Sequence, residues 1–147
     1  MIRPARPADV PAIAAIARLA YSHYVPRIGL EPLPMVDDYD RRVADGQAWV
    51  LEQDREIVGI LVLEEQADDF LLDNVAVHPD HQGQGHGRTL IAFAEAHARS
   101  RGWPSIWLYT NVRMTENIAL YQALGFVETG RDTYAGRHRV HMRKTLG

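Results

Sequence analysis

The chain has 147 residues and no cysteine, and this absence removes several kinds of chemistry. Disulfides, thiolate catalysis and cysteine-ligated zinc all need a sulfur that the sequence does not supply. No apolar run approaches the ~20 residues needed to span a bilayer, and the first residues lack the apolar segment of a signal peptide. The formal net charge of -3 lacks the basic excess common in nucleic-acid-binding proteins. We therefore expect a cytoplasmic protein that binds neither membrane nor nucleic acid.

The composition is that of a globular protein, with 46% apolar and 24% charged residues. A chain of this length buries roughly 68–70% of the surface that it exposes when unfolded, which is enough for a real core. No linker, low-complexity tract or internal repeat interrupts it. We therefore expect a single domain over residues 1–147.

Segments with apolar residues at helical spacing alternate with short apolar runs typical of strands. The expected helices run from Val10 to before Pro26 and over 35–45, 88–101 and 115–124, with Asp9 and Thr115 as candidate N-caps. Residues 27–34 are expected to form a loop. The expected strands cover 48–52, 57–63, 70–77, 105–110, 126–129 and 138–144. The run 57–63 does not alternate, which predicts a strand covered on both faces. The order predicts a mixed α/β domain with helices on both faces of its sheet.

The most informative segment is residues 75–87, which read VAVHPDHQGQGHG and precede a helical stretch. A helix start offers unpaired N–H groups and a positive dipole end to an anion, and glycine lets a phosphate approach the backbone. The spacing of Gly83, Gly85 and Gly87 is G-x-G-x-G, whereas a dinucleotide loop needs G-x-G-x-x-G. A Walker A loop needs a lysine that is absent here. The segment therefore predicts a phosphate or pyrophosphate site of another kind.

Residues 82–87, QGQGHG, resemble the Q/R-x-x-G-x-G/A loop with which the GNAT superfamily of N-acetyltransferases binds the pyrophosphate of acetyl-CoA. Residues 75–79, VAVHP, resemble the strand before that loop. A second match lies in order about 30 residues later, where NIALYQALGF at 117–126 resembles the family's N-x-A-L-Y helix and its L-G-F exit. The resemblance covers essentially the whole chain, and most specifically residues 70–130.

The resemblance implies a GNAT-type mixed sheet of about six to seven strands, splayed between the strands at 70–77 and 105–110. The pantetheine arm of acetyl-CoA would lie in that split against the backbone of Val75 and Val77, as an added strand does. No metal is implied. The residues expected to bind the cofactor are Val75, Ala76, Val77, Gln82, Gly83, Gln84, Gly85, His86, Gly87, Arg88 and Asn117.

Acetyl transfer to an amine needs a base, because a lysine-like amine of pKa ~10.4 is protonated at neutral pH. It also needs a proton donor for the thiolate that leaves. Tyr121 is the candidate acid, since it shares a helix face with Asn117 and its hydroxyl stays protonated at neutral pH. The resemblance places this tyrosine beside the sulfur of acetyl-CoA. The alternative is a tyrosine that only packs between helix and sheet.

Asp73 is the candidate base, because polyamine-type members of the family carry a glutamate at this position. Burial there would raise the pKa of its carboxyl. The alternative is an aspartate that is merely solvated at a strand end. Tyr109 stands where some peptide-N-terminus acetyltransferases carry a glutamate, which argues against a peptide-type base. Glu64 and Glu65 are expected to be solvated charges.

The acceptor pocket is expected between the first two helices, their loop and the last hairpin. Arg27 is a candidate partner for a substrate carboxylate, and Asp37 or Asp38 for an ammonium. Seven histidines do not predict a metal site, since no H-x-x-x-H pair accompanies them. The polar and aromatic residues expected in the pocket are Tyr21, Tyr24, Arg27, Met35, Asp37, Asp38 and Tyr39.

These observations favour an acetyl-CoA-dependent N-acetyltransferase that modifies a primary amine of a small molecule or peptide by direct attack in a ternary complex. A non-catalytic acyl-CoA-binding module and a protein that binds another pyrophosphate ligand are the alternatives. A homodimer is compatible with the sequence, which does not determine the oligomeric state or the acceptor.

Overall fold

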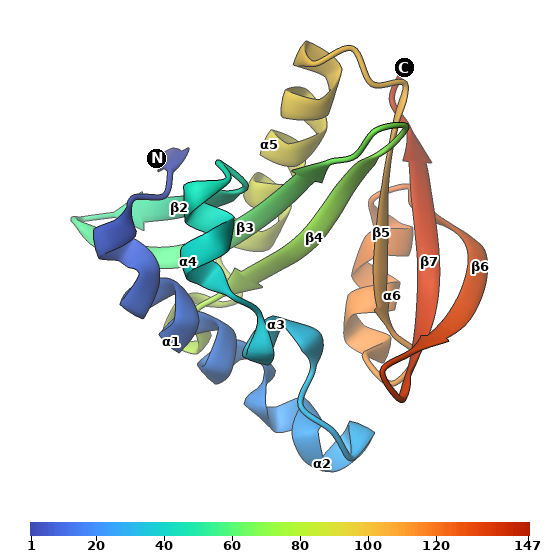
Figure 1. Ribbon diagram of the computed structural model, residues 1–147, viewed down its shortest axis with the longest axis horizontal. Coiled ribbons are helices and arrows are strands. Elements are labelled where there is room, and N and C mark those ends of the chain that lie inside the picture. The colour runs from blue at the N-terminus through green and yellow to red at the C-terminus, as the bar shows by residue number, and fades with distance from the viewer.

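The computed structural model describes all residues from 1 to 147 and contains one mixed sheet of seven strands (Figure 1). The strands are β1 (Ile2–Pro4), β2 (Ala48–Gln53), β3 (Glu56–Glu65), β4 (Phe70–Val77), β5 (Ser105–Asn111), β6 (Val127–Tyr134) and β7 (Arg137–Thr145). Their order is β1-β2-β3-β4-β5-β7-β6, and all neighbours are antiparallel except the parallel pair β4 and β5. The expected mixed sheet is confirmed.

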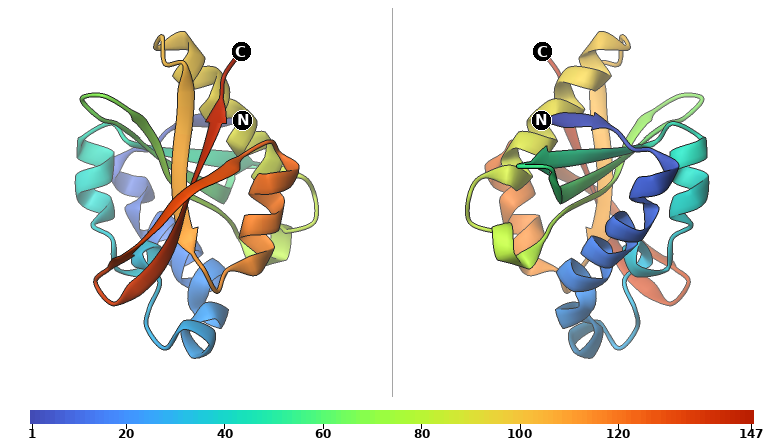
Figure 2. Two further views of the ribbon diagram at one scale, coloured as in Figure 1. Left: turned by 90° about the vertical axis from the view of Figure 1, so that its right-hand side faces the viewer. Right: turned by 90° about the vertical axis from the view of Figure 1, so that its left-hand side faces the viewer.

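Helices cover both faces of this sheet, as expected (Figures 1 and 2). One face carries α1 (Val10–Tyr21), α2 (Val25–Ile28), α3 (Leu33–Val36) and α4 (Tyr39–Ala44), and the other carries α5 (His86–Ser100) and α6 (Thr115–Ala123). Each face has its own apolar core cluster. Ile60 and Leu61 of β3 are fully buried and belong to opposite clusters, so this strand is covered on both faces as its composition predicts.

The sheet splits between its two central strands (Figure 1). β4 and β5 are paired only at Leu71–Trp107 and Leu72–Leu108, and they diverge beyond this point. A β-bulge lies at the same place, because Val62 of β3 pairs with Asn74 while Leu63 pairs with Leu72. Asp73 is thus the extra residue of β4. A bulge re-aims a side chain and often lies beside a functional site.

Several boundaries on the N-terminal side differ from expectation. The first α-helix ends at Tyr21, a 3-10 turn follows, and Pro26 lies in the first turn of α2 instead of ending a helix. Proline is tolerated there because the first N–H groups of a helix are unpaired anyway. The expected loop 27–34 therefore contains parts of α2 and α3. The expected helix 35–45 is broken at Asp37, where the backbone is extended.

Asp9 is the N-cap residue of α1, as expected, but its side chain makes no capping hydrogen bond. The carboxylate of Asp9 instead binds Arg3 Nη1 at 2.8 Å and the backbone N–H of Arg6 at 2.8 Å. The other candidate, Thr115, is not an N-cap. Met114, one residue before Thr115, is the N-cap of α6 and makes no side-chain cap. Asp38 caps α4 by accepting the Arg41 backbone N–H at 3.1 Å.

Two strands, β1 and β6, have no apolar pattern in the sequence. β1 is only three residues long, and most residues of β6 are exposed. The last hairpin is accordingly longer than the expected strands 126–129 and 138–144.

No helix combines the length and the apolar character needed to cross a membrane.

Candidate active site

The glycine loop and the start of α5 form one wall of a cleft of about 430 Å³. Gly83 and Gly85 have φ angles of 80° and 84°, a left-handed conformation that residues with a Cβ rarely adopt. Gly85 is the N-cap residue of α5, so the helix begins two residues earlier than expected. The loop therefore needs glycine at these two positions to reach the helix.

The backbone N–H groups from Gly83 to Arg88 have no hydrogen-bond acceptor within the protein. The first N–H of this region with an acceptor is that of Thr89, which donates to the carbonyl of Gly85 at 3.1 Å. Unpaired donors at a helix N-terminus favour an anion, because the helix dipole is positive there. The segment thus has the geometry of a phosphate cradle.

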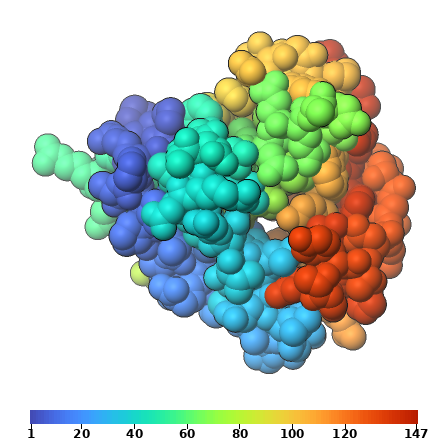
Figure 3. All heavy atoms as spheres, viewed as in Figure 1, coloured from blue at the N-terminus to red at the C-terminus, as the bar shows by residue number.

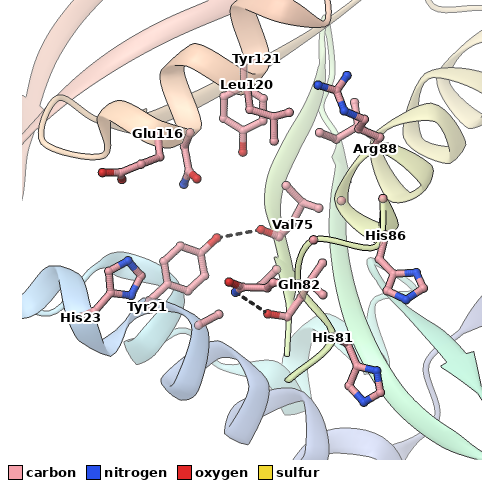
Figure 4. Close-up of a pocket in the computed structure, with 18 of the residues that line it drawn as sticks. Tyr21, His23, Val75, His81, Gln82, His86, Arg88, Glu116, Leu120 and Tyr121 are labelled. Atoms are coloured by element: carbon pink, nitrogen blue, oxygen red, sulfur yellow. Dashed lines mark hydrogen bonds between the residues drawn. The ribbon is translucent and has the colours of Figure 1, made fainter. Parts of the chain in front are cut away.

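Ten of the eleven residues expected to bind the cofactor line this cleft, and Gln84 does not. The Gln84 Oε1 atom instead lies 3.2 Å from Nε2 of His86. On the opposite wall, the Gln82 side chain donates to the carbonyl of Val77 at 3.1 Å (Figure 4). The Tyr21 hydroxyl lies 3.0 Å from the carbonyl oxygen of Val75. These two carbonyls of β4 therefore face the cleft with one protein donor each.

Tyr121 lines both this cleft and a second, smaller cavity, so it lies where the two meet. Its side chain is buried, and its hydroxyl points from α6 into the space in front of β4 (Figure 4). The hydroxyl makes no hydrogen bond to the protein, and no fully buried polar side-chain atom lacks a partner, so this oxygen reaches the open cavity. Burial raises the pKa of Tyr121, which keeps the hydroxyl protonated and able to donate.

The carboxylate of Asp73 lies at the far side of the split, held by two side chains. It accepts from the Tyr109 hydroxyl at 2.8 Å and from Arg42 Nη2 at 3.2 Å, and its side chain is only 8% exposed. Asp73 is therefore not the solvated strand-end aspartate of the alternative interpretation. Burial raises the pKa of Asp73, and this effect outweighs the lowering by Arg42 and Tyr109.

The guanidinium of Arg42 is the main residue that sequence reasoning missed. It is buried and contacts three carboxylates: Asp37 at 2.9 Å, Glu64 at 3.0 Å and Asp73 at 3.2 Å. The expectation that Glu64 is merely solvated was wrong. No local signal points to this cluster, because 31 residues separate Arg42 from Asp73.

Glu65 is also engaged, although its side chain remains exposed. It pairs with Arg101 at 2.9 Å and accepts from the Trp103 indole at 3.1 Å. These hydrogen bonds lower the pKa of Glu65. Glu65 is the last residue of β3, two residues after Leu63 at the bulge, and it lines neither the cleft nor the second cavity.

The second cavity, of about 50 Å³, begins where the cleft ends and shares Tyr21, Val75, Asn117 and Tyr121 with it. Its outer walls are residues 32–34 and the β6–β7 hairpin, as the expected acceptor location requires. Figure 3 shows the surface hollowed where the blue-to-cyan N-terminal segment meets the orange-red hairpin. The cavity also contains side chains that the sequence did not single out, including Arg137 and Arg139.

Most of the side chains expected in the acceptor pocket do not reach it. Met35, Asp37, Asp38 and Tyr39 line neither cavity, and Tyr24 lines only the larger one. The guanidinium of Arg27 pairs with Glu116 at 2.8 Å and lines neither.

Tyr39 supports the pocket from behind. Its hydroxyl donates to the Pro34 carbonyl and accepts from the Asn74 amide at 3.1 Å. Asn74 in turn accepts from the Tyr21 hydroxyl at 2.8 Å. This buried chain of hydrogen bonds ties the 32–34 segment to β4.

Two of the seven histidines lie close together, since the ring centroids of His78 and His81 are 5.9 Å apart. No group of three or more His, Asp or Glu side chains is arranged to hold a metal ion.

The glycine loop, the split sheet and the tyrosine at its centre together define an acyl-CoA-type transferase fold. The profile of the "Acetyltransferase (GNAT) domain" matches residues 44–128, more than half of the chain. The chain therefore belongs to the GNAT acetyltransferase family.

Individual relatives agree with this assignment. The [ribosomal protein bS18]-alanine N-acetyltransferase of Escherichia coli K12 is 35% identical over 78 residues, which are 53% of this chain and 53% of that protein. The chain thus matches about half the length of this relative.

Among solved structures, PaiA N-acetyltransferase from Thermoplasma acidophilum in complex with coenzyme A has a TM-score of 0.84 at 18% identity, over 99% of this chain and 98% of that one. yncA of Salmonella typhimurium, solved with acetyl-CoA, has a TM-score of 0.74 at 25% identity, over 100% and 94%. The first of these likenesses concerns the fold alone.

Proposed function

We propose that the protein is an acetyl-CoA-dependent N-acetyltransferase that modifies a primary amine of a small molecule or peptide. The observation that carries the proposal is the row of unpaired N–H groups from Gly83 to Arg88, in one cleft with the unpaired hydroxyl of Tyr121. An anion site alone would fit many ligands. A proton donor at the far end of the same cleft fits a ligand whose reacting group lies there.

The residues present fit acetyl-CoA. The N–H groups of the loop would bind the pyrophosphate, and the arm that follows it would run along β4 past Val77 and Val75. The two carbonyls that face the cleft there keep one lone pair each for the cofactor, since each accepts one protein donor. Two solved neighbours in the family's fold contain coenzyme A or acetyl-CoA, which supports this choice of ligand.

In the proposed reaction, the acceptor ammonium gives one proton to the Asp73 carboxylate, and the neutral amine attacks the thioester carbonyl. A C–N bond forms, the C–S bond breaks, and the thiolate takes the proton of Tyr121. The new amide nitrogen loses its second proton through solvent to the Tyr121 oxygen, which restores the tyrosine. A backbone N–H of β4 stabilises the oxyanion. Asp73 of β4 and Tyr121 of α6 both line the small cavity, so base and acid would act within one site. Burial suits Asp73 to this role, because a raised pKa makes a carboxylate a stronger base.

Release of CoA thiol from acetyl-CoA tests the proposal directly. Purified protein is assayed with polyamines, free amino acids, and peptides with free N-termini, and we expect amine-dependent thiol release. CoA binding without release from any amine would instead support a non-catalytic acyl-CoA-binding module. Competition calorimetry of CoA against NAD and ATP separates both from a binder of another pyrophosphate ligand.

A further inference from the structure

Charged side chains of both signs line the small cavity. Asp73 is one of them, and the single positive charge of Arg42 is shared among Asp73, Asp37 and Glu64. Three carboxylates on one guanidinium leave an excess of negative charge. The surroundings of Asp73 therefore favour a cation such as an ammonium group.

Two arginines from the hairpin, Arg137 and Arg139, also line this cavity, and their surroundings differ. Arg139 is neutralised by Asp132 at 2.7 Å, and its guanidinium carbon lies 4.3 Å from the ring centre of Tyr109. Arg137 has no carboxylate within 4.0 Å. It is half-buried and is the only charge of this cavity without a counter-ion.

Backbone carbonyls hold the Arg137 side chain in place. Its Nε and Nη2 atoms donate to the Glu31 carbonyl at 3.0 and 2.6 Å, and Nη1 donates to the Ala135 carbonyl at 2.9 Å. A guanidinium has five N–H donors, so two remain, one on each terminal nitrogen. A carboxylate suits such remaining donors, because a guanidinium presents them in a planar fork and binds the anion through charge-assisted hydrogen bonds.

We propose that the acceptor is an amine that also carries a carboxylate, with the amine directed to Asp73 and the carboxylate bound by Arg137. This inference rests on the proposed acetyltransferase function and narrows its substrate class. Asp73 and Arg137 line the same cavity of about 50 Å³, so the amine and the carboxylate would belong to one acceptor molecule. A free amino acid and a peptide with an acidic residue near its N-terminus both present this chemistry.

The sequence pointed to a different arginine for this role. Arg27 was the candidate for a substrate carboxylate, but its charge is neutralised by Glu116. The Tyr24 hydroxyl donates to the same carboxylate at 2.8 Å. Arg137 takes its place because the β6–β7 turn brings it against Glu31, 106 residues earlier in the chain.

Paired acceptors that differ only in the carboxylate test the inference. One arm compares free alanine and glycine with alaninamide and glycinamide, and the other compares Ala-Glu peptides with Ala-Gln peptides. We expect kcat/KM to favour the carboxylate member by at least tenfold in one arm. Preference in the first arm identifies a free amino acid, and preference in the second identifies an acidic peptide.

The variant R137Q should abolish this preference by raising KM for the carboxylate member. R137K keeps the charge without the fork and should retain part of the preference, which separates lost charge from a loosened 31–34 segment. R131Q is the matched control, because Arg131 is exposed on the same hairpin, pairs with Glu128 and does not line the cavity.

The two proposals fail in different ways. Equal turnover of charged and neutral acceptors in both arms, unchanged in R137Q, would overturn the carboxylate inference and leave the acetyltransferase function standing. No thiol release from any amine would overturn both.

Discussion

The proposed site has a cofactor half and an acceptor half, which are built in different ways. The cofactor half consists mainly of backbone groups from one continuous segment, residues 75–88, with Asn117 and Tyr121 added by one helix. The acceptor half consists of side chains whose partners are far apart in sequence, such as Asp73 with Arg42 and Arg137 with Glu31. One half is a local conformation, whereas the other exists only after the whole chain has folded.

This difference indicates that donor binding and acceptor selectivity can be changed separately by substitution. The backbone cradle depends on the conformation of residues 83–88. Only substitutions that change a φ angle or place a side chain in the cradle should therefore disturb it. A side-chain pocket depends on the identity of each residue and on its charge partners. Substitutions in one half should therefore change donor affinity and those in the other should change acceptor selectivity or turnover.

The largest effect is expected at Tyr121, which lines both the cleft and the acceptor cavity. In Y121F the turnover number should fall by about 10³-fold, because the variant lacks the proposed acid and general acid–base catalysis contributes 10²–10⁴-fold. Calorimetry should show CoA affinity unchanged, since the hydroxyl makes no bond in the free protein. Y134F, which alters an exposed hairpin tyrosine, is the control. Undiminished turnover in Y121F would remove the acid role.

D73N should lower kcat/KM by about 10²-fold near neutral pH, and less at high pH where the amine is already neutral. The base acts only when ionised, so activity is present above the pKa of Asp73 and is lost as the pH falls through it. Because burial raises this pKa, the acidic limb of the wild-type profile lies above the usual aspartate range.

Two variants test whether the acidic limb of the pH profile belongs to Asp73. D73N should lack it, and R42Q should move it to higher pH, because Arg42 lowers the pKa of Asp73. An acidic limb that stays in place in both variants would assign the titration to another group.

A smaller effect is expected in the cradle. G85A should weaken CoA binding roughly tenfold, because a left-handed conformation costs an alanine about 1–2 kcal/mol. Turnover at saturating acetyl-CoA should be retained. G46A is a matched control, since Gly46 has a φ of 70° and lies in the turn after α4, outside the cleft. Equal losses of affinity in both variants would show a general destabilisation instead.

The smallest effect concerns stability. Y21F removes the hydroxyl that bonds the buried Asn74 side chain at 2.8 Å, and it should lower the free energy of unfolding by about 1–3 kcal/mol. Urea denaturation measures this loss, with Y134F again as control. Because Tyr21 lines both cavities, turnover should also fall. A variant as stable as wild type would show that Asn74 finds another donor.

Much of the fold follows from patterns within single elements. β5 alternates between buried and half-buried residues, and α5 has an apolar stripe that contains Leu90, Ile91 and Ala94. Such periodicities identify strands and helices locally. β1 and most of β6 escaped prediction because edge strands with exposed side chains have no apolar pattern. The breaks around Pro26 and Asp37 depend on packing against the sheet.

For the site, the sequence by itself predicted an anion-binding loop from its glycine spacing and the helix that follows. The spacing of four residues placed Asn117 and Tyr121 on one helix face, and the family resemblance supplied the expected role of Tyr121. Tertiary structure decided the charges of the acceptor cavity. The bulge exposes Asp73 to Arg42, Glu116 neutralises Arg27, and the hairpin carries Arg137 to Glu31. A charge acts through the groups that surround it, and those groups meet only in the folded chain.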